Sequence, residues 1–236
     1  MLDNRAYYDE FSNWYENRRH AGYHALIDDL ETEIVMPYCH DRDVLEIGCG
    51  TGLILRRVEP VARFAAGLDI SAGMLETAAD RGLSVVQASA TALPFADASF
   101  DTLYSFKVLA HVQDIGKALQ EFARVTRSGG TLVLEFYNRH SLRYAVKRAA
   151  SPGAISATTN ESAVYTRWDT QEEILRLMPP ELEFVRTAGV RVWTPAAFAH
   201  KVPVVRNVLA TAERYSRDAK PFNRYGGFLV LILKKR

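Results

Sequence analysis

The chain has 236 residues, 48% of them hydrophobic, so it can bury a full core, and we expect one domain with embellishments. Its net charge of +1 gives no electrostatic support for nucleic-acid binding. The two cysteines, Cys39 and Cys49, have the spacing of neither a zinc site nor a disulfide framework. This cysteine usage favours a reduced, cytoplasmic protein.

Neither end of the chain has the pattern of a membrane segment. The first residues, MLDNRAYYDEFSNWYENRR, are charged and aromatic, which argues against a signal peptide or an anchor. The longest apolar run, GGFLVLILKKR at the end, has the length of a strand and is too short to span a bilayer. We therefore expect no membrane span.

Strand-like and helix-like segments alternate along the middle of the chain. In the last helical segment Ile115, Leu119, Phe122 and Val125 recur at helical spacing. Strands that alternate with helices and are apolar on both faces predict a parallel sheet covered on both sides, a doubly wound α/β fold. The predicted strands are 43–48, 64–70, 83–88, 100–106 and 130–137, and the predicted helices are 51–59, 71–81 and 114–127.

Three glycines follow the first predicted strand, in the sequence VLEIGCGTG. Gly48, Gly50 and Gly52 allow a tight turn and let a ligand lie against bare backbone, while the following helix offers N–H groups. Open α/β sheets bind ligands in such a crevice, at the carboxyl ends of their strands. The spacing is G-x-G-x-G and Glu46 precedes it, whereas nicotinamide and flavin domains typically have G-x-G-x-x-G.

The second predicted strand ends in LDIS, which places Asp69 at its carboxyl end. A carboxylate there can accept hydrogen bonds from both hydroxyls of a ribose. It can also cap the helix that begins near Ser71, and the two roles can coexist. Asp69 therefore indicates a nucleoside without saying which one.

An ordered set of five motifs resembles the class I S-adenosylmethionine-dependent methyltransferases. The motifs are VLEIGCGTG, LDIS, ALPFADASFD, LAHV and EFARVTRSGG, and they cover roughly residues 40–137. Each is weak alone, but the ordered set is specific. The resemblance implies a Rossmann-like, seven-stranded sheet whose last two strands form an antiparallel hairpin, with 182–193 and 225–235 as the candidate strands.

The resemblance also implies a cofactor, S-adenosyl-L-methionine, with S-adenosyl-L-homocysteine as its product. Glu46 would lie near the methionine amino group, and Asp69 would hold the ribose. Ser89 stands where the family usually has an acidic residue that accepts from the adenine amino group, so the neighbouring backbone would contribute more. The full set of expected cofactor residues is Tyr15, Tyr23, Glu46, Gly48, Cys49, Gly50, Gly52, Asp69, Ile70, Met74, Ser89, Ala90, Thr91 and Phe106.

Such a site must align a nucleophile behind the activated methyl carbon and exclude water. An amine that arrives unprotonated needs no strong base, whereas a phenol or an activated carbon acid benefits from one. The candidate acid/base residues are His111, after the fourth predicted strand, and Tyr137 and His140, at the end of the fifth. A structural or cofactor-adjacent role is the alternative for His111. No residue pattern indicates a metal.

The first 40 residues are rich in aromatic side chains and form two helical candidates. One interpretation is a lid in which Tyr15 and Tyr23 cover the cofactor, because aromatic faces suit a sulfonium cation. The other is an aromatic helix face packed on the sheet. We predict one domain made of a helical lid (1–40), a cofactor-binding core (41–137), substrate-side insertions with the sixth strand (138–224) and a last strand (225–236).

The substrate-side region begins with a basic segment. Arg139, Arg143 and Lys147 share one face of a predicted helix, which could attract a phosphate, a carboxylate or an anionic membrane, although a solvated face is the favoured interpretation. A cap at Asp169 or Thr170 should start another helix. An apolar helical insertion between the last two strands could roof the substrate pocket or form a homodimer contact.

The sequence therefore predicts a cytoplasmic S-adenosylmethionine-dependent methyltransferase that acts on nitrogen, oxygen or carbon of a small molecule. No nucleic-acid partner is expected from the near-neutral charge. Three alternatives stay open: a protein or lipid-linked acceptor, a cofactor-binding protein of the same fold without catalysis, and a nicotinamide-dependent oxidoreductase.

Overall fold

A central sheet organises the computed structural model, which describes residues 9, 22–149, 165–194 and 203–236. The strands are β1 (Asp43–Ile47), β2 (Phe64–Asp69), β3 (Val85–Gln87), β4 (Phe100–Ser105), β5 (Thr126–Tyr137), β6 (Leu182–Val190) and β7 (Phe228–Lys235). The α-helices of the described residues are α2 (Tyr23–Val35), α3 (Leu55–Val58), α4 (Ala72–Asp80), α5 (Ile115–Val125), α6 (Leu142–Ala149), α7 (Gln171–Arg176) and α8 (Pro203–Asp218). Short 3₁₀ turns are η2 (Met36–Tyr38), η3 (Glu59–Val61), η4 (Leu109–His111) and η7 (Phe222–Tyr225).

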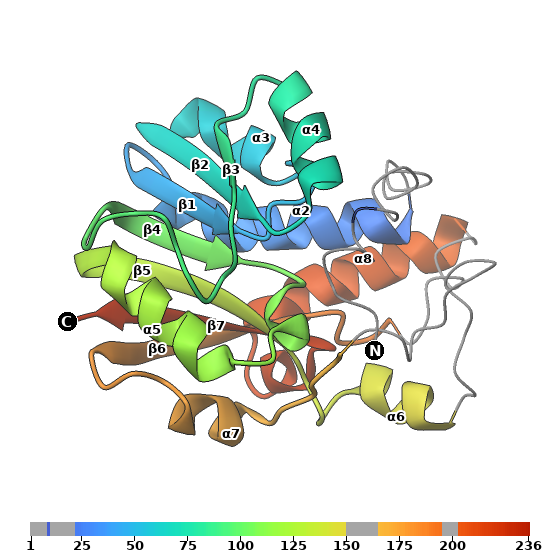
Figure 1. Cartoon of the computed structure of the whole chain (residues 1–236). Coiled ribbons are helices and arrows are strands. Elements are labelled where there is room, and N and C mark those ends of the chain that lie inside the picture. The colour runs from blue at the N-terminus through green and yellow to red at the C-terminus, as the bar shows by residue number, and fades with distance from the viewer. Residues whose placement is uncertain (1–8, 10–21, 150–164, 195–202) are drawn as a thin grey trace.

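The strand order is β3-β2-β1-β4-β5-β7-β6 (Figure 1). The first five strands are parallel, and β7 runs antiparallel between β5 and β6. This confirms the doubly wound fold with an antiparallel terminal pair. In the register, Tyr137 of β5 lies opposite Phe228 of β7, which lies opposite Val190 of β6. The end of β5, the start of β7 and the end of β6 therefore meet at the carboxyl edge of the parallel strands.

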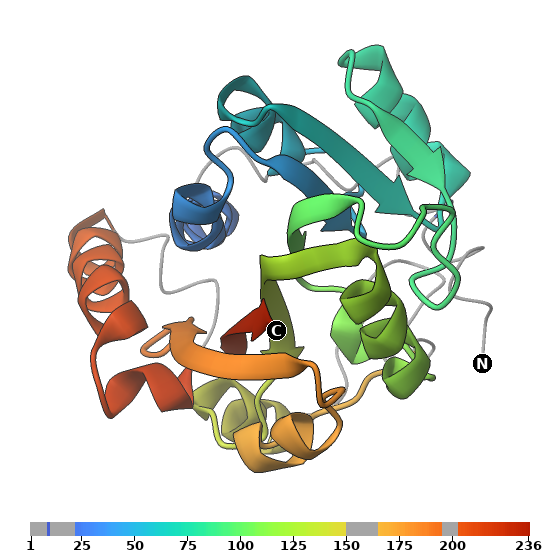
Figure 2. The same ribbon diagram turned by 90° about the vertical axis from the view of Figure 1, so that its left-hand side faces the viewer.

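Alternating side chains divide the apolar residues of the sheet between two cores. Val133 and Ile232 belong to the core that includes α2 and α3, whereas Leu132, Leu134 and Leu231 belong to the core that includes α5. Figure 2 shows α2 and α8 on one side of the sheet and α5 on the other. The period-2 pattern of a strand covered on both faces thus fixes which helix each residue meets.

Local side chains set the ends of several elements. Ser71 starts α4 because its hydroxyl accepts from the Met74 N–H at 3.2 Å. Thr170, the second of the two predicted caps, starts α7 with a complete capping box to Glu173. The helix predicted from residue 51 begins only at Leu55, because turns occupy the four residues before it.

Strand β6 ends at Val190, three residues before the predicted end. The buried carboxylate of Glu213 on α8 accepts the backbone N–H groups of Val192, Trp193 and Thr194 at 2.7, 3.0 and 2.9 Å. These donors point to a side chain, so they cannot extend the sheet. One residue of α8 thereby fixes the turn after β6.

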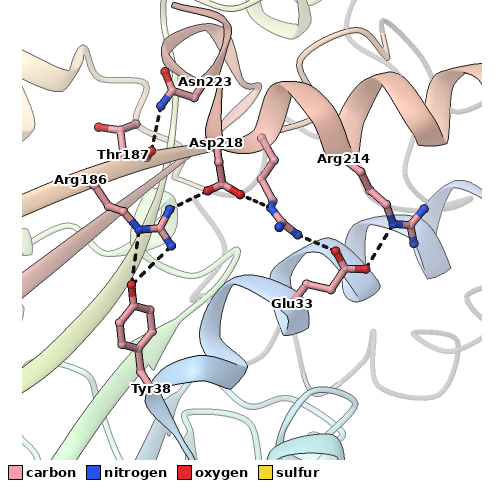
Figure 3. A network of polar contacts seen from close by, with 8 residues as sticks. Glu33, Tyr38, Arg186, Thr187, Arg214, Asp218 and Asn223 are labelled. Atoms are coloured by element: carbon pink, nitrogen blue, oxygen red, sulfur yellow. Dashed lines mark hydrogen bonds and ion pairs between the residues drawn. The ribbon is translucent and has the colours of Figure 1, made fainter. Parts of the chain in front are cut away.

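Helix α8, the predicted insertion between the last two strands, is tied to α2 and β6 by exposed ion pairs (Figure 3). Glu33 of α2 accepts from Arg214 at 3.3 Å and from Arg217 at 2.5 Å. Asp218 accepts from Arg217 and from Arg186 of β6, at 2.9 and 2.6 Å. The insertion therefore packs against its own chain. Across the described residues, no helix combines the length and the apolar character needed to cross a bilayer.

Candidate active site

The loop after β1 requires its glycines. Gly48, Gly50 and Gly52 have φ values of 72°, 54° and 80°, in the left-handed region that other residues rarely adopt. A Cβ at Gly48 would also lie 2.1 Å from Val108 Cγ2. The loop is bound to the next strand, since the Gly48 N–H donates to the Leu68 carbonyl at 2.6 Å. Its backbone is thus fixed, with the Val108 side chain packed against Gly48 and the Leu83 side chain packed against Gly52.

Asp69 joins this loop to the turn after β2. Its Oδ2 accepts from the Gly50 N–H at 2.8 Å, and its Oδ1 accepts from the Ser71 N–H at 2.9 Å. Burial raises the pKa of the carboxyl. Each oxygen keeps a second lone pair, so Asp69 can hold the loop and also accept from a ribose diol. Helix α4 is capped by Ser71 instead, which leaves Asp69 for the loop and the ligand.

Asp9, the one described residue of the segment 1–21, lies at this turn. Its Oδ1 accepts from the Ser71 hydroxyl at 2.6 Å and from the Gly73 N–H at 3.3 Å. Its charge contributes to the raised pKa of Asp69. Part of the predicted lid therefore reaches the Asp69 turn. Tyr15, one of the two predicted lid tyrosines, lies outside the described residues.

Glu46 is a buried carboxyl on β1. It accepts a hydrogen bond from the Tyr104 hydroxyl at 2.9 Å, and burial raises its pKa to about 8. A neighbouring ammonium group would favour the ionised form and offset this desolvation. The chemistry of the site therefore fits S-adenosylmethionine: acceptors for a ribose at Asp69, bare backbone in the loop, and a carboxyl for the methionine amino group at Glu46.

The other predicted cofactor residues lie in the segments that follow β2, β3 and β4. Met74 and Phe106 are buried, and Ile70 is exposed. The Ser89 hydroxyl hydrogen bonds the Thr91 hydroxyl at 2.8 Å and accepts from the Thr91 N–H at 3.2 Å, in a turn that also contains Ala90.

Cys49 has a packing contact inside the loop. Its sulfur would lie 2.6 Å from a Cβ added to Gly67, so the thiol fits against the bare backbone of β2. Burial raises the pKa of this thiol, which keeps it protonated and unreactive. The side chain holds the loop on the sheet.

A buried charged cluster lies at the ends of β4 and β5. Lys107 Nζ is 2.8 Å from both Asp28 and Glu31 of α2, and the Lys107 N–H donates to Glu135 of β5 at 3.0 Å. Burial, followed by the charge of Glu31, raises the pKa of Glu135 well above its usual value. Sequence reasoning missed this cluster. Two acidic residues at otherwise apolar positions could have indicated it, because Glu31 shares a helix face with Ile27 and Glu135 interrupts an apolar strand.

Two of the three predicted acid/base residues lie together. His111 Nδ1 is 2.9 Å from the Tyr165 carbonyl, and His111 Nε2 is 3.5 Å from the Tyr137 hydroxyl. A carbonyl can only accept, so Nδ1 carries the proton and Nε2 presents its lone pair towards Tyr137. Burial lowers the pKa of His111, which favours the neutral ring.

His140 is not part of this pair. It is exposed, and its backbone N–H donates to Asn138 Oδ1 at 2.9 Å. Tyr23, at the start of α2, is buried, with the Arg191 guanidinium 5.1 Å from its ring centroid. The charges that act on its hydroxyl are those of Arg191, Arg143, Lys107 and Glu31. Tyr23 therefore lies beside Arg191, the residue that follows β6.

The carboxyl edge of the sheet thus has two parts. We call the loop 48–52 with Asp69 and Glu46 the cofactor half. We call the ends of β5 and β6 and the start of β7, with the adjoining residues of α2, η4 and α6, the acceptor half. The described residues contain no group of His, Cys, Asp and Glu arranged to hold a metal ion.

Comparisons with known proteins show which chains and folds this protein resembles. A family described as "Methyltransferase domain" matches residues 45–134. The chain is 32% identical over 145 residues to an uncharacterized protein of Methanocaldococcus jannaschii, covering 61% of this chain and 55% of that one. It is 31% identical over 157 residues to the demethylmenaquinone methyltransferase of Mycolicibacterium vanbaalenii, covering 64% and 68%. The chain thus spans about half the length of the Methanocaldococcus relative.

A solved structure from Thermotoga maritima, described as an SAM-dependent methyltransferase and possible histamine N-methyltransferase, superposes with a TM-score of 0.71. It is 22% identical and covers 99% of this chain and 100% of its own, so it supports the fold. Fold and loop define a Rossmann-like α/β protein with a glycine loop after its first strand. Together with the sequence matches, they place the chain in the class I S-adenosylmethionine-dependent methyltransferases, whose cofactor is S-adenosylmethionine.

Proposed function

We propose that the protein transfers a methyl group to nitrogen, oxygen or carbon of a small-molecule acceptor. The observation that carries the proposal is the His111–Tyr137 pair, which lies in the acceptor half, beyond β4 from the glycine loop. The demethylmenaquinone methyltransferase relatives, named for a small-molecule acceptor, support this substrate class.

When bound, S-adenosylmethionine supplies a methyl carbon already activated by its sulfonium. The chain itself must position the acceptor and take up its proton. The lone pair on His111 Nε2 can accept that proton directly or through the Tyr137 hydroxyl, and the Tyr165 carbonyl stabilises the resulting imidazolium through Nδ1–H. This arrangement serves hydroxyl or carbon acceptors, whereas an unprotonated amine would need only positioning.

Isotope-labelled S-adenosylmethionine, incubated with the protein and a metabolite extract, tests the proposal. We expect a labelled product together with S-adenosylhomocysteine. His111→Gln should lower kcat about 100-fold or more for a hydroxyl or carbon acceptor. His140→Gln should change it less than about twofold, because that ring is exposed.

The pH profile sharpens this test. The lowered pKa of His111 keeps its base form present below the ordinary value of 6.5. On lowering the pH, kcat should therefore begin to decrease only below pH 6.5. Binding of S-adenosylhomocysteine without labelled product from any extract would favour a cofactor-binding protein without catalysis. Binding of NADH in its place would contradict the assignment.

A further inference from the structure

Arg143 on α6 has an unusual environment for a cation. Its guanidinium carbon lies 4.1 Å from the ring centroid of Tyr137, 4.4 Å from that of Phe228 and 4.8 Å from that of Trp168. Within the described part of the chain, no carboxylate lies at ion-pair distance from it, and its buried Nη1 has no hydrogen-bond partner. Arg143 is therefore not part of a solvated helix face, as the sequence pattern suggested.

The energetics favour a missing anionic partner. Each ring face attracts the charge of the guanidinium. A buried N–H without an acceptor is, in contrast, unfavourable. A ring offers the guanidinium N–H groups no strong acceptor, and the buried Nη1 has none. The rings thus leave the hydrogen-bonding edge of Arg143 for another group.

The side chain is held in place before any ligand arrives. Gly227 leaves room for its stem, because a Cβ there would lie 3.0 Å from Arg143 Cβ and 3.1 Å from Cδ. The surrounding rings also contact each other at tilted angles, with the Tyr137 ring centroid 5.1 Å from that of Trp168 and 5.4 Å from that of Phe228. A fixed guanidinium loses little entropy when it binds a planar or tetrahedral anion.

The position of Arg143 links it to the proposed chemistry. Its charge acts on Tyr23 of α2, His111 of η4, Glu135 of β5 and Arg191 after β6. Its ring contacts to Tyr137 of β5 and Phe228 of β7 place the guanidinium where these two strands meet, in the acceptor half. Tyr137 contacts both Arg143 and His111, so a group bound to Arg143 lies next to the proposed proton acceptor.

We propose that Arg143 binds an anionic group of the methyl acceptor, a carboxylate or a phosphate, and that the substrate is therefore an acid. This inference rests on the proposed methyl transfer and adds the charge of the substrate. Arg191, a second guanidinium in the same half with its Nε donating to the Thr194 carbonyl at 3.0 Å, adds to the positive field.

Binding of two small probes to the protein saturated with S-adenosylhomocysteine gives the first test. We expect benzoate or phenyl phosphate to bind. The probe that binds more tightly shows whether the site prefers a carboxylate or a phosphate. Arg143→Met should weaken that probe at least about tenfold, and Arg143→Lys should restore part of the affinity. Arg148→Met is the matched control, because Arg148 lies on the same helix, is exposed and, among the described residues, has its guanidinium carbon near the Tyr144 ring, at 6.0 Å.

Several results would overturn the inference. They are no binding of either probe to the wild type, equal affinities in the wild type and Arg143→Met, or an equal loss in Arg148→Met. A tenfold loss of S-adenosylhomocysteine affinity in Arg143→Met would also overturn it, because Arg143 would then serve the cofactor carboxylate. Circular dichroism and melting curves of each variant verify folding.

Fractionation of the metabolite extract on an anion exchanger separates this inference from the proposed function. We expect the methylated product to arise from the retained, acidic fraction. Product formed only from the unretained fraction would overturn the inference and leave methyl transfer standing. Probe binding at Arg143 with no product from any fraction would contradict the proposed function while the anion site stood.

Discussion

The cofactor half and the acceptor half share one edge of the sheet but are built in different ways. In the cofactor half, five consecutive residues and one carboxylate on the next strand define the geometry, mostly through backbone conformation. In the acceptor half, side chains from α2, η4, β5, α6 and the start of β7 converge. A site built from backbone tolerates few substitutions, and a short sequence motif is enough to predict it. A pocket built from side chains can change its ligand by single substitutions.

Gly48→Ala should have the largest effect on the cofactor half. Its positive φ and the 2.1 Å approach of a Cβ to Val108 require the backbone to shift, at a cost on the order of 3 kcal/mol or more. Urea unfolding and calorimetric titration with S-adenosylhomocysteine measure the loss of stability and affinity.

Gly82→Ala is the control for Gly48→Ala. Its φ is 78° with nothing near the added Cβ, so it should cost only about 1 kcal/mol and leave affinity unchanged. Equal effects of the two variants would show that the loop adapts, contrary to a rigid backbone seat.

Glu46→Gln should change how stability depends on pH. The folded pKa of about 8 exceeds the ordinary 4.5, so the stabilising contribution of protonated Glu46 is full below about pH 4.5 and is lost as pH rises through 8. The stability of the variant relative to wild type should therefore grow by about 1.4 kcal/mol per pH unit across that window.

Unfolding of the cofactor-free protein at several pH values checks the Glu46 prediction. Glu121→Gln is the control of opposite sign, because the guanidinium of Arg124 lowers the pKa of Glu121 and its contribution is constant above about pH 4.5. If the free energies of unfolding of wild type and Glu46→Gln changed in parallel with pH, Glu46 would already be ionised in the folded protein.

Asp69→Ala should weaken cofactor binding by about 1–3 kcal/mol, because a ribose diol would lose its acceptor and the loop its tie to Gly50. Asp114→Ala removes another acidic acceptor of backbone N–H groups, the cap of α5, and should leave affinity unchanged. Calorimetry with S-adenosylhomocysteine measures both, and unchanged affinity in Asp69→Ala would remove that residue from the site.

The smallest effect should come from the exposed ion pairs of α8. Glu33→Ala removes the contacts to Arg214 and Arg217 at the surface, so we expect a loss below about 1 kcal/mol that shrinks in high salt. Both halves should keep their ligands. A loss of several kcal/mol in thermal unfolding would instead make α8 part of the support of the acceptor half.

The contrast also explains what the sequence could predict. The doubly wound alternation and the glycine loop follow from patterns only a few residues long, whereas the antiparallel terminal pair follows from the resemblance to the methyltransferases, and the structure confirms this fold. The sequence named His111 and Tyr137 as separate acid/base candidates, and their pairing comes from the structure alone. Arg143 was interpreted as solvated because its environment comes from Trp168 and Phe228, 25 and 85 residues further along the chain. No local pattern encodes such a contact.

A crystal structure with S-adenosylhomocysteine tests the central claim, that one edge of the sheet seats a nucleoside cofactor on backbone and its acceptor on side chains. The account predicts the ribose hydroxyls on Asp69, the adenosine against the glycine loop, and the sulfur directed towards the His111–Tyr137 pair. An adenosine bound elsewhere, or a sulfur directed away from the acceptor half, would contradict it.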